Sequence, residues 1–270
     1  MRKYFAIFLS LFSFNAFAED KPLTTPTCLP EAVLTTPVTL FLTESIKAQY
    51  APFVIEGHIK SWLEHSNTVM RNSCIPMKRT LKEVVYISEL LDINFQDIYA
   101  VHDLLAYYYP DRMEALQPNK SHHHVYPYYG VVFSTRNSAF NPDKCGQTDV
   151  ALYPQFFVLD ISCPKIVLEH ELGHLAWANH DIDTLSYQTE GYLFDLAAWL
   201  PVGLHSKIKQ YAYGYHCGGK GTVMSYADEF HPFYSSPSIA FDGIACGNEV
   251  YADNARVLRE YAEAKLAITN

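Results

Sequence analysis

The stretch from residue 170 to residue 180 reads His-Glu-Leu-Gly-His-Leu-Ala-Trp-Ala-Asn-His. On a helix, His170 and His174 lie four residues apart, so both imidazoles project from one face. A catalytic zinc ion takes three protein ligands and leaves a fourth position to water. His180 can be the third ligand if the helix ends soon after His174 and the chain bends back. Glu171 is then placed to take a proton from the zinc-bound water. The spacing therefore predicts a catalytic Zn²⁺ site, with one ion.

The opposite face of this expected helix is apolar. Leu168, Leu172 and Leu175 follow one another at helical spacing, so they form a stripe that faces a core. Pro164 stands a few residues upstream, and proline is well tolerated in the first turn of a helix. We expect an active-site helix that is anchored by its leucines and presents its histidines to a cleft.

The N-terminus has the pattern of an export signal. Arg2 and Lys3 precede an apolar run from Tyr4 to Phe14, and Ala-Phe-Ala at 16–18 is a small-residue cleavage site. The apolar run is too short for a good membrane span. We expect residues 1–18 to be a signal peptide and the mature protein to be secreted or periplasmic, with no stable membrane anchor.

The chain is acidic, and its cysteines fit an exported protein. The formal net charge is −9, and loss of the two basic residues of the signal peptide makes it −11 (−9 − 2). This charge argues against nucleic acid as a partner. An even number of cysteines in an exported chain indicates three disulfides, for which fifteen pairings exist. The six are Cys28, Cys74, Cys145, Cys163, Cys217 and Cys246.

Apolar periodicity predicts strands alternating with helices upstream of the motif. Ile55, Ile59 and Trp62, for example, recur at helical spacing. The order strand–helix–strand–helix–strand is typical of an α/β layer. We expect an extended Thr/Pro-rich leader at 19–37 and a single domain at 38–270. Within it, strands are expected at 38–42, 81–88 and 125–134, helices at 52–70 and 95–105, short strands at 145–153 and 155–161, and a closing helix within 250–266.

A second signal follows the zinc motif. Residues 221–226 read Gly-Thr-Val-Met-Ser-Tyr. Together with H-E-x-x-H-x-x-x-x-x-H, this stretch resembles the metzincin zinc peptidases. Asp181, directly after the third histidine, is similar to the adamalysin or reprolysin branch. The resemblance implies that His170, His174 and His180 are zinc ligands and that Glu171 is the general base. It also implies that residues 221–226 form a tight turn, the methionine turn, in which Met224 is the hydrophobic floor of the site.

The resemblance also implies a fold and a substrate. The fold is α/β (α+β) and zincin/metzincin-like, with a five-stranded mixed sheet over the active-site helix, a smaller irregular lower subdomain and a C-terminal helix. A protein or peptide substrate would lie extended along the edge strand, around Gln147 to Leu152, and be cleaved internally by a monomer. Tyr226 matches a tyrosine that some metzincins use as a fifth ligand and oxyanion support; the alternative is plain packing beside the turn.

The resemblance further implies how the cysteines pair. Cys145 with Cys163 would join the edge strand to its neighbour, and Cys217 with Cys246 would clasp the region of the methionine turn. Cys28 would then pair with Cys74. The alternative is that Cys28 is a leader cysteine that binds the zinc and keeps the enzyme latent.

One residue departs from the family pattern. Trp177 stands where metzincins usually have the glycine that makes the bend toward the third ligand. A left-handed backbone conformation costs a non-glycine residue about 1–2 kcal/mol. If the bend displaces His180, then Asp181 or Glu190 could replace it as ligand. A distorted site would instead leave a zinc- or peptide-binding protein with little or no turnover. Both motifs favour the interpretation that the protein is a secreted zinc metalloendopeptidase.

Overall fold

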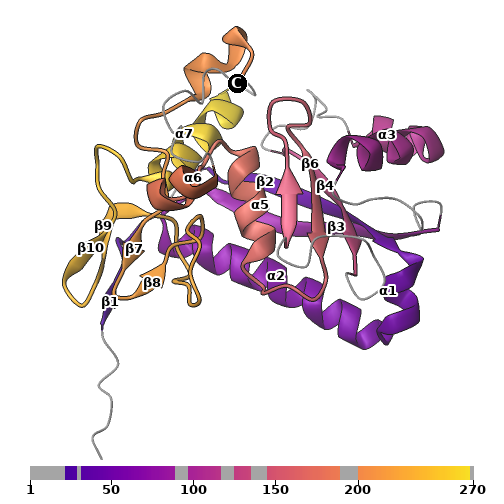
Figure 1. Ribbon diagram of the computed structural model, residues 1–270, viewed down its shortest axis with the longest axis horizontal. Helices are drawn as coiled ribbons and strands as arrows, with labels where there is room; N and C mark the ends of the chain where they lie inside the picture. The colour runs from indigo at the N-terminus through magenta and orange to yellow at the C-terminus, as the bar shows by residue number, and fades with distance from the viewer. Residues whose placement is uncertain are drawn as a thin grey trace, which may run out of the picture.

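The computed structural model describes residues 22–28, 32–88, 97–116, 125–134, 145–188 and 200–267. These ranges, which are coloured in Figure 1, include the helix α5 (Val167–Leu175). They also include all three histidines of the motif and the methionine turn. The predicted signal peptide at 1–18 lies outside the described residues, and so does Glu190.

A five-stranded mixed sheet forms the centre of the molecule, as predicted. Its strands lie in the order β3-β2-β4-β6-β5. Four of them are mutually parallel, and β5 pairs with β6 in the antiparallel direction at one edge. The strands are β2 (Leu34–Thr43), β3 (Met77–Ile87), β4 (Tyr128–Phe133), β5 (Gly146–Thr148) and β6 (Phe156–Asp160).

The two faces of the sheet belong to separate cores, because side chains alternate along a strand. In β2, Leu40 and Leu42 join the core on one face, whereas Phe41 joins the core on the other. The first core contains residues of α2 (Pro52–Asn72), α5 (Val167–Leu175) and α7 (Asn254–Ala267). The second contains residues of α3 (Ile98–Tyr108) and α4 (Pro110–Ala115). Helix α5, which carries the histidine motif, therefore packs on this face of the sheet beside α2.

Local sequence signals explain where the long helices begin. Pro52 occupies the first turn of α2, where its missing N–H costs nothing. The side chain of Asp97 caps α3 by accepting hydrogen bonds from the backbone N–H groups of Tyr99 and Ala100. The short helix α1 (Glu44–Gln49) connects β2 to α2.

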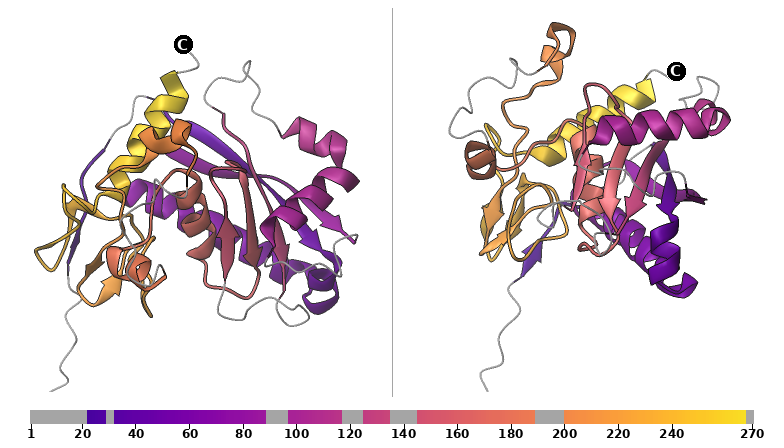
Figure 2. Two further views of the ribbon diagram at one scale, coloured as in Figure 1. Left: turned by 45° about the horizontal axis from the view of Figure 1, so that its top comes forward. Right: turned by 45° about the vertical axis from the view of Figure 1, so that its right-hand side comes forward.

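The smaller part of the molecule is irregular, again as expected. It contains α6 (Ile182–Gln188), a 3₁₀ helix η3 (Val202–Lys207) and two small sheets. Figure 2 shows this part on the side of the central sheet away from α3. The first small sheet has the order β1-β9-β10, and the second pairs β7 with β8. The strands are β1 (Leu23–Thr24), β7 (His216–Cys217), β8 (Lys220–Gly221), β9 (Ser236–Phe241) and β10 (Ile244–Cys246).

The leader is more structured than its composition suggests. We expected residues 19–37 to be extended and unpacked, but Leu23 and Thr24 pair with β9 and residues 34–37 belong to β2. An extended Thr-rich segment can satisfy its backbone groups on any open strand edge, and β9 offers one.

Three disulfides connect the elements, with the pairings that the resemblance implies. Cys28 is bonded to Cys74, Cys145 to Cys163 and Cys217 to Cys246. Because Cys28 is bonded to another sulfur, it is not available as a zinc ligand. Disulfides persist in oxidising compartments, so these bonds indicate an extracellular or periplasmic protein. Within the described ranges, no helix combines the length and the apolar character that crossing a membrane requires.

Candidate metal centre and substrate cleft

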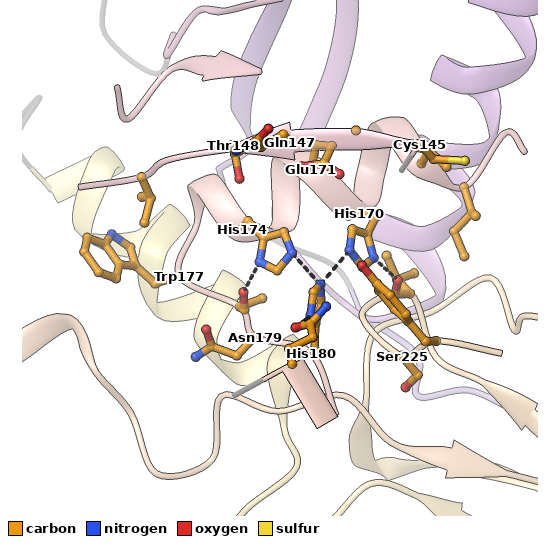
Figure 3. A pocket seen from close by; sticks show the side chains of 18 of the residues that line it. Cys145, Gln147, Thr148, His170, Glu171, His174, Trp177, Asn179, His180 and Ser225 are labelled. Atoms are coloured by element: carbon orange, nitrogen blue, oxygen red, sulfur yellow. Dashed lines mark hydrogen bonds between the residues drawn. The ribbon is translucent and has the colours of Figure 1, made fainter. Parts of the chain in front are cut away.

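Helix α5 presents the first two histidines of the motif. Its Leu168, Leu172 and Leu175 are buried in the core beneath the sheet, as the periodicity predicts. His170 and His174 lie on the opposite side of the helix and line a cleft of about 700 Å³. Figure 3 shows both imidazoles turned toward His180.

The helix ends in a turn that brings His180 back to the site. The N–H of Trp177 donates to the carbonyl of His174 at 2.9 Å, and the N–H of Ala178 donates to that of Gly173 at 3.0 Å. This pair of bonds is the Schellman motif, in which the residue at the position of Trp177 is usually glycine. Trp177 adopts the left-handed conformation there, with φ +73°. The bend is therefore the usual one, and the tryptophan bears its cost of about 1–2 kcal/mol.

The three imidazoles converge on one point. Nε2 of His180 lies 3.0 Å from Nε2 of His170 and 2.9 Å from Nε2 of His174. His180 is 8% exposed, so its ring is fixed at the floor of the cleft. Among the described residues, this is the group of histidine, cysteine and acidic side chains that could hold a metal ion.

The other nitrogen of each ring faces an oxygen acceptor. Nδ1 of His170 lies 2.8 Å from the carbonyl oxygen of Val223, and Nδ1 of His174 lies 3.0 Å from that of Ala178. Nδ1 of His180 lies 2.9 Å from the side-chain oxygen of Gln188. In each neutral ring, Nδ1 therefore carries the proton and the lone pair of Nε2 points at the common centre. Sequence reasoning missed Gln188, and no motif marks it.

The charge state of the rings agrees with metal binding. Burial, with repulsion from His180, lowers the pKa of His170 to about 3. Burial is also the main cause of the lowered pKa of His174 and of His180. All three rings are consequently neutral near pH 7, which is the form that binds a metal.

The side chain of Glu171, a residue of α5, faces the edge strand β5. Its side chain is 5% exposed, and a Cβ added to Gly146 of β5 would come within 2.6 Å of its carboxyl oxygen. Glycine at 146 therefore leaves the space that the carboxyl group occupies. Burial raises the pKa of Glu171 to about 8, against a hydrogen bond from Thr148 that lowers it.

The methionine turn lies directly beneath the helix. Met224 is fully buried, and a Cβ on Gly173 would lie 2.6 Å from its sulfur. Tyr226 lies beside the histidines, with its ring centroid 4.7 Å from that of His180, and it is 56% exposed. The structure thus brings together every residue that the two motifs predict for the site.

Asp181 joins the third histidine to the methionine turn instead of replacing it as a ligand. Its carboxylate accepts hydrogen bonds from the N–H and hydroxyl of Thr184 at 2.9 and 2.7 Å. It also accepts one from the N–H of Tyr226 at 3.2 Å. These bonds lower the pKa of Asp181 although burial opposes them. Because His180 lies with the other two histidines, it is not displaced from the site. Neither Asp181 nor Glu190 is therefore needed as a substitute ligand.

The edge strand that borders the cleft is shorter than expected. β5 spans Gly146–Thr148, and the residues from Asp149 to Leu152 form a turn. Only one side of β5 is paired with a strand of the described chain, namely β6. The other side lies at the cleft, where Gln147 and Thr148 line the wall above the histidines (Figure 3).

No family model matches the chain, and no curated protein matches its sequence. Among solved structures, one described as a chaperone–substrate complex is similar with a TM-score of 0.63 and 13% identity over 88% of this chain. At that identity the likeness concerns the fold alone. The chain covers 35% of that protein's length. Metalloproteinase-II from Bacteroides fragilis aligns with a TM-score of 0.35 and 15% identity, over 56% of this chain and 45% of its own.

Proposed function

We propose that the chain is an exported zinc-dependent metalloendopeptidase of metzincin type. The observation that carries the proposal is the convergence of three neutral imidazole nitrogens, each oriented by an oxygen on the opposite side of its ring. The predicted signal peptide and the three disulfides support export.

The residues fit a zinc ion. Two nitrogens bound to one zinc at about 2.0–2.1 Å in tetrahedral geometry stand roughly 3.3 Å apart, and Nε2 of His180 lies 3.0 and 2.9 Å from Nε2 of His170 and of His174. Three lone pairs that face one another at this distance repel unless a cation lies between them. A set of three histidine ligands leaves a fourth position for water, which is the arrangement of a catalytic rather than a structural site.

Zinc, when bound, supplies a Lewis acid that lowers the pKa of a water at its open position to roughly 7. Glu171 accepts the proton of the attacking water and passes it to the leaving amine nitrogen. Its burial between α5 and β5 keeps bulk water away from the carboxyl group. Tyr226, exposed beside His180, donates its hydroxyl proton in a hydrogen bond to the developing oxyanion.

The open side of β5 aligns the substrate. An extended peptide adds to a free strand edge through main-chain hydrogen bonds, and side chains then enter pockets alternately. The cleft runs along β5 and past the histidines. A bound peptide therefore extends on both sides of the histidines and is cleaved at an internal bond.

A paired measurement of zinc content and cleavage tests the proposal. Glu171→Ala should abolish cleavage of a broad peptide library while the purified protein retains about one zinc ion per chain. Glu56→Gln, which alters an exposed carboxyl group on α2, is the matched control and should keep wild-type activity. If the wild type binds zinc but cleaves nothing, the chain is a zinc- or peptide-binding protein and the peptidase proposal fails.

A further inference from the structure

A second pocket continues the substrate cleft beyond Trp177. It has a volume of about 430 Å³ and shares four lining residues with the cleft, namely Val150, Ala151, Trp177 and Lys207. Trp177 lies on the far side of His174 from His170 (Figure 3). The two hollows therefore adjoin, with the three histidines in the first and Trp177 at the junction.

The second pocket is basic, although the chain as a whole carries a net charge of −9. Lys207, Lys209 and Lys265 line it together with one acid, Glu260. That acid is already satisfied, because it accepts hydrogen bonds from Arg256 at 2.9 Å and from the Tyr211 hydroxyl. Within the described part of the chain, none of the three lysines has a carboxylate within ion-pair distance.

Lys265 is the lysine that the pocket holds in place. Its Nζ lies 3.8 Å from the ring centroid of Tyr126 and 5.3 Å from that of Tyr261, so the ammonium is held against two aromatic faces. Burial, with repulsion from Lys207, lowers the pKa of Lys265 to about 8. An anion between the two lysines would offset the repulsion and replace part of the lost hydration.

The position of the pocket along β5 determines which part of a substrate reaches it. β5 runs from Gly146 to Thr148, and the pocket begins at Val150 and Ala151, beyond its C-terminal end. Antiparallel pairing is the more stable of the two directions per residue, so we take the peptide to run antiparallel to β5, which places its N-terminal part at this end. Side chains on the N-terminal side of the scissile bond thus reach the lysines, whereas those on the other side extend past Cys145.

We propose that this pocket is a specificity subsite for an acidic side chain on the N-terminal side of the cleaved bond, read by Lys265 and Lys207. The proposal rests on the proposed peptidase function. Trp177 and the two tyrosines pack against the aliphatic part of that side chain, and the ammonium groups bind its carboxylate. The substrate class is therefore an acidic peptide segment.

Cleavage of matched peptides tests the subsite. In a set of otherwise identical fluorogenic peptides, glutamate is placed at each position N-terminal to the cleaved bond and compared with glutamine there. At one position, the wild type should cleave the glutamate peptide with about tenfold higher kcat/KM. Lys265→Met should bring this ratio close to one, and Lys265→Arg should keep most of it. Lys60→Met removes a charge from the exposed face of α2 and should leave the ratio unchanged.

Peptide binding separates this proposal from the peptidase proposal. The Glu171→Ala variant cannot cleave, so its Kd for the glutamate and glutamine peptides reports the subsite alone. The glutamate peptide should bind about tenfold more tightly, and Lys265→Met in the same background should abolish the difference. Selective binding without cleavage by the wild type would refute the peptidase and retain the subsite. Equal affinities, or no measurable binding of either peptide, would overturn the subsite.

Discussion

Replacing Arg79 by methionine should destabilise the protein by about 3–5 kcal/mol, because it leaves a charged carboxylate in the core. Arg79 lies in β3 and Glu169 in the active-site helix, and both side chains are 0% exposed. Their two hydrogen bonds measure 2.8 and 3.0 Å in a parallel fork. Glu169 directly precedes the first histidine ligand, so the pair also fixes the helix that presents it.

The size of the expected loss in stability follows from the hydrogen bonds that Arg79→Met removes. Hydrogen bonds to charged groups contribute about 1.5–3 kcal/mol each, and Glu169 loses two of them in the variant. The Thr36 hydroxyl also loses the hydrogen bond that Arg79 donates to it at 3.1 Å. Glu169 then keeps a single side-chain partner among the described residues, the Tyr234 hydroxyl at 2.6 Å. Burial lowers the pKa of Arg79, but the charge and hydrogen bonds of Glu169 outweigh burial and raise it above its ordinary value. The guanidinium is therefore charged, and its removal leaves an uncompensated anion.

Urea denaturation of the mature, disulfide-bonded protein measures this loss. Arg112→Met is the matched control, because Arg112 and Glu83 form an ion pair of the same 2.8 Å length with side chains 47% and 39% exposed. An exposed pair contributes less than about 1 kcal/mol. The double variant Arg79→Met, Glu169→Met should recover part of the stability that Arg79→Met loses. Equal losses for Arg79→Met and Arg112→Met would refute the reasoning.

Three further changes test the site and the fold. Tyr226→Phe should lower kcat roughly 100-fold with unchanged zinc content, since it removes one oxyanion donor; an unchanged kcat would mean that Tyr226 only packs. Gln188→Ala should weaken zinc binding roughly 10–100-fold in a chelator competition, because His180 loses the acceptor that orients it. Burial, with the charge of Lys165, lowers the pKa of His65 from 6.5 to about 4. The unfolded chain therefore takes up a proton between these pH values that the folded chain does not, and stability falls as pH drops through the window. Between pH 7 and pH 4.5, the free energy of unfolding of His65→Leu should therefore fall by roughly 1–3 kcal/mol less than that of the wild type, as measured by denaturation at both pH values.

The regular part of the fold was predictable because its elements carry strong periodic signals. The sheet strands other than β5 and the long helix α2 lie close to their expected ranges, since apolar side chains repeat along them. The helices α1, α4 and α6 have six or seven residues each and span too few turns for such a pattern. Strand β1 was not predicted, because it has two residues that pair with β9, far away in the sequence, and so short a strand has no apolar periodicity of its own.

The three histidines of the candidate site were predictable, and the groups that orient them were not. His170, His174 and His180 lie within eleven residues of sequence, so their spacing alone defines the site. The carbonyl of Val223 reaches His170 across more than fifty residues, and any residue type offers a carbonyl. The Arg79–Glu169 pair spans ninety residues, and neither residue lies in a motif. At Trp177 the sequence suggested a distorted site, because a tryptophan replaces the usual glycine. The structure shows the usual bend instead, since Trp177 adopts the left-handed conformation.

A crystal structure of the zinc-loaded mature protein, with anomalous data at the zinc edge, tests the central claim most directly. One anomalous peak should lie about 2.0–2.1 Å from Nε2 of His170, His174 and His180, with the carboxyl group of Glu171 outside bonding distance. A peak bound by only two of these histidines, or one completed by Glu190, would contradict it.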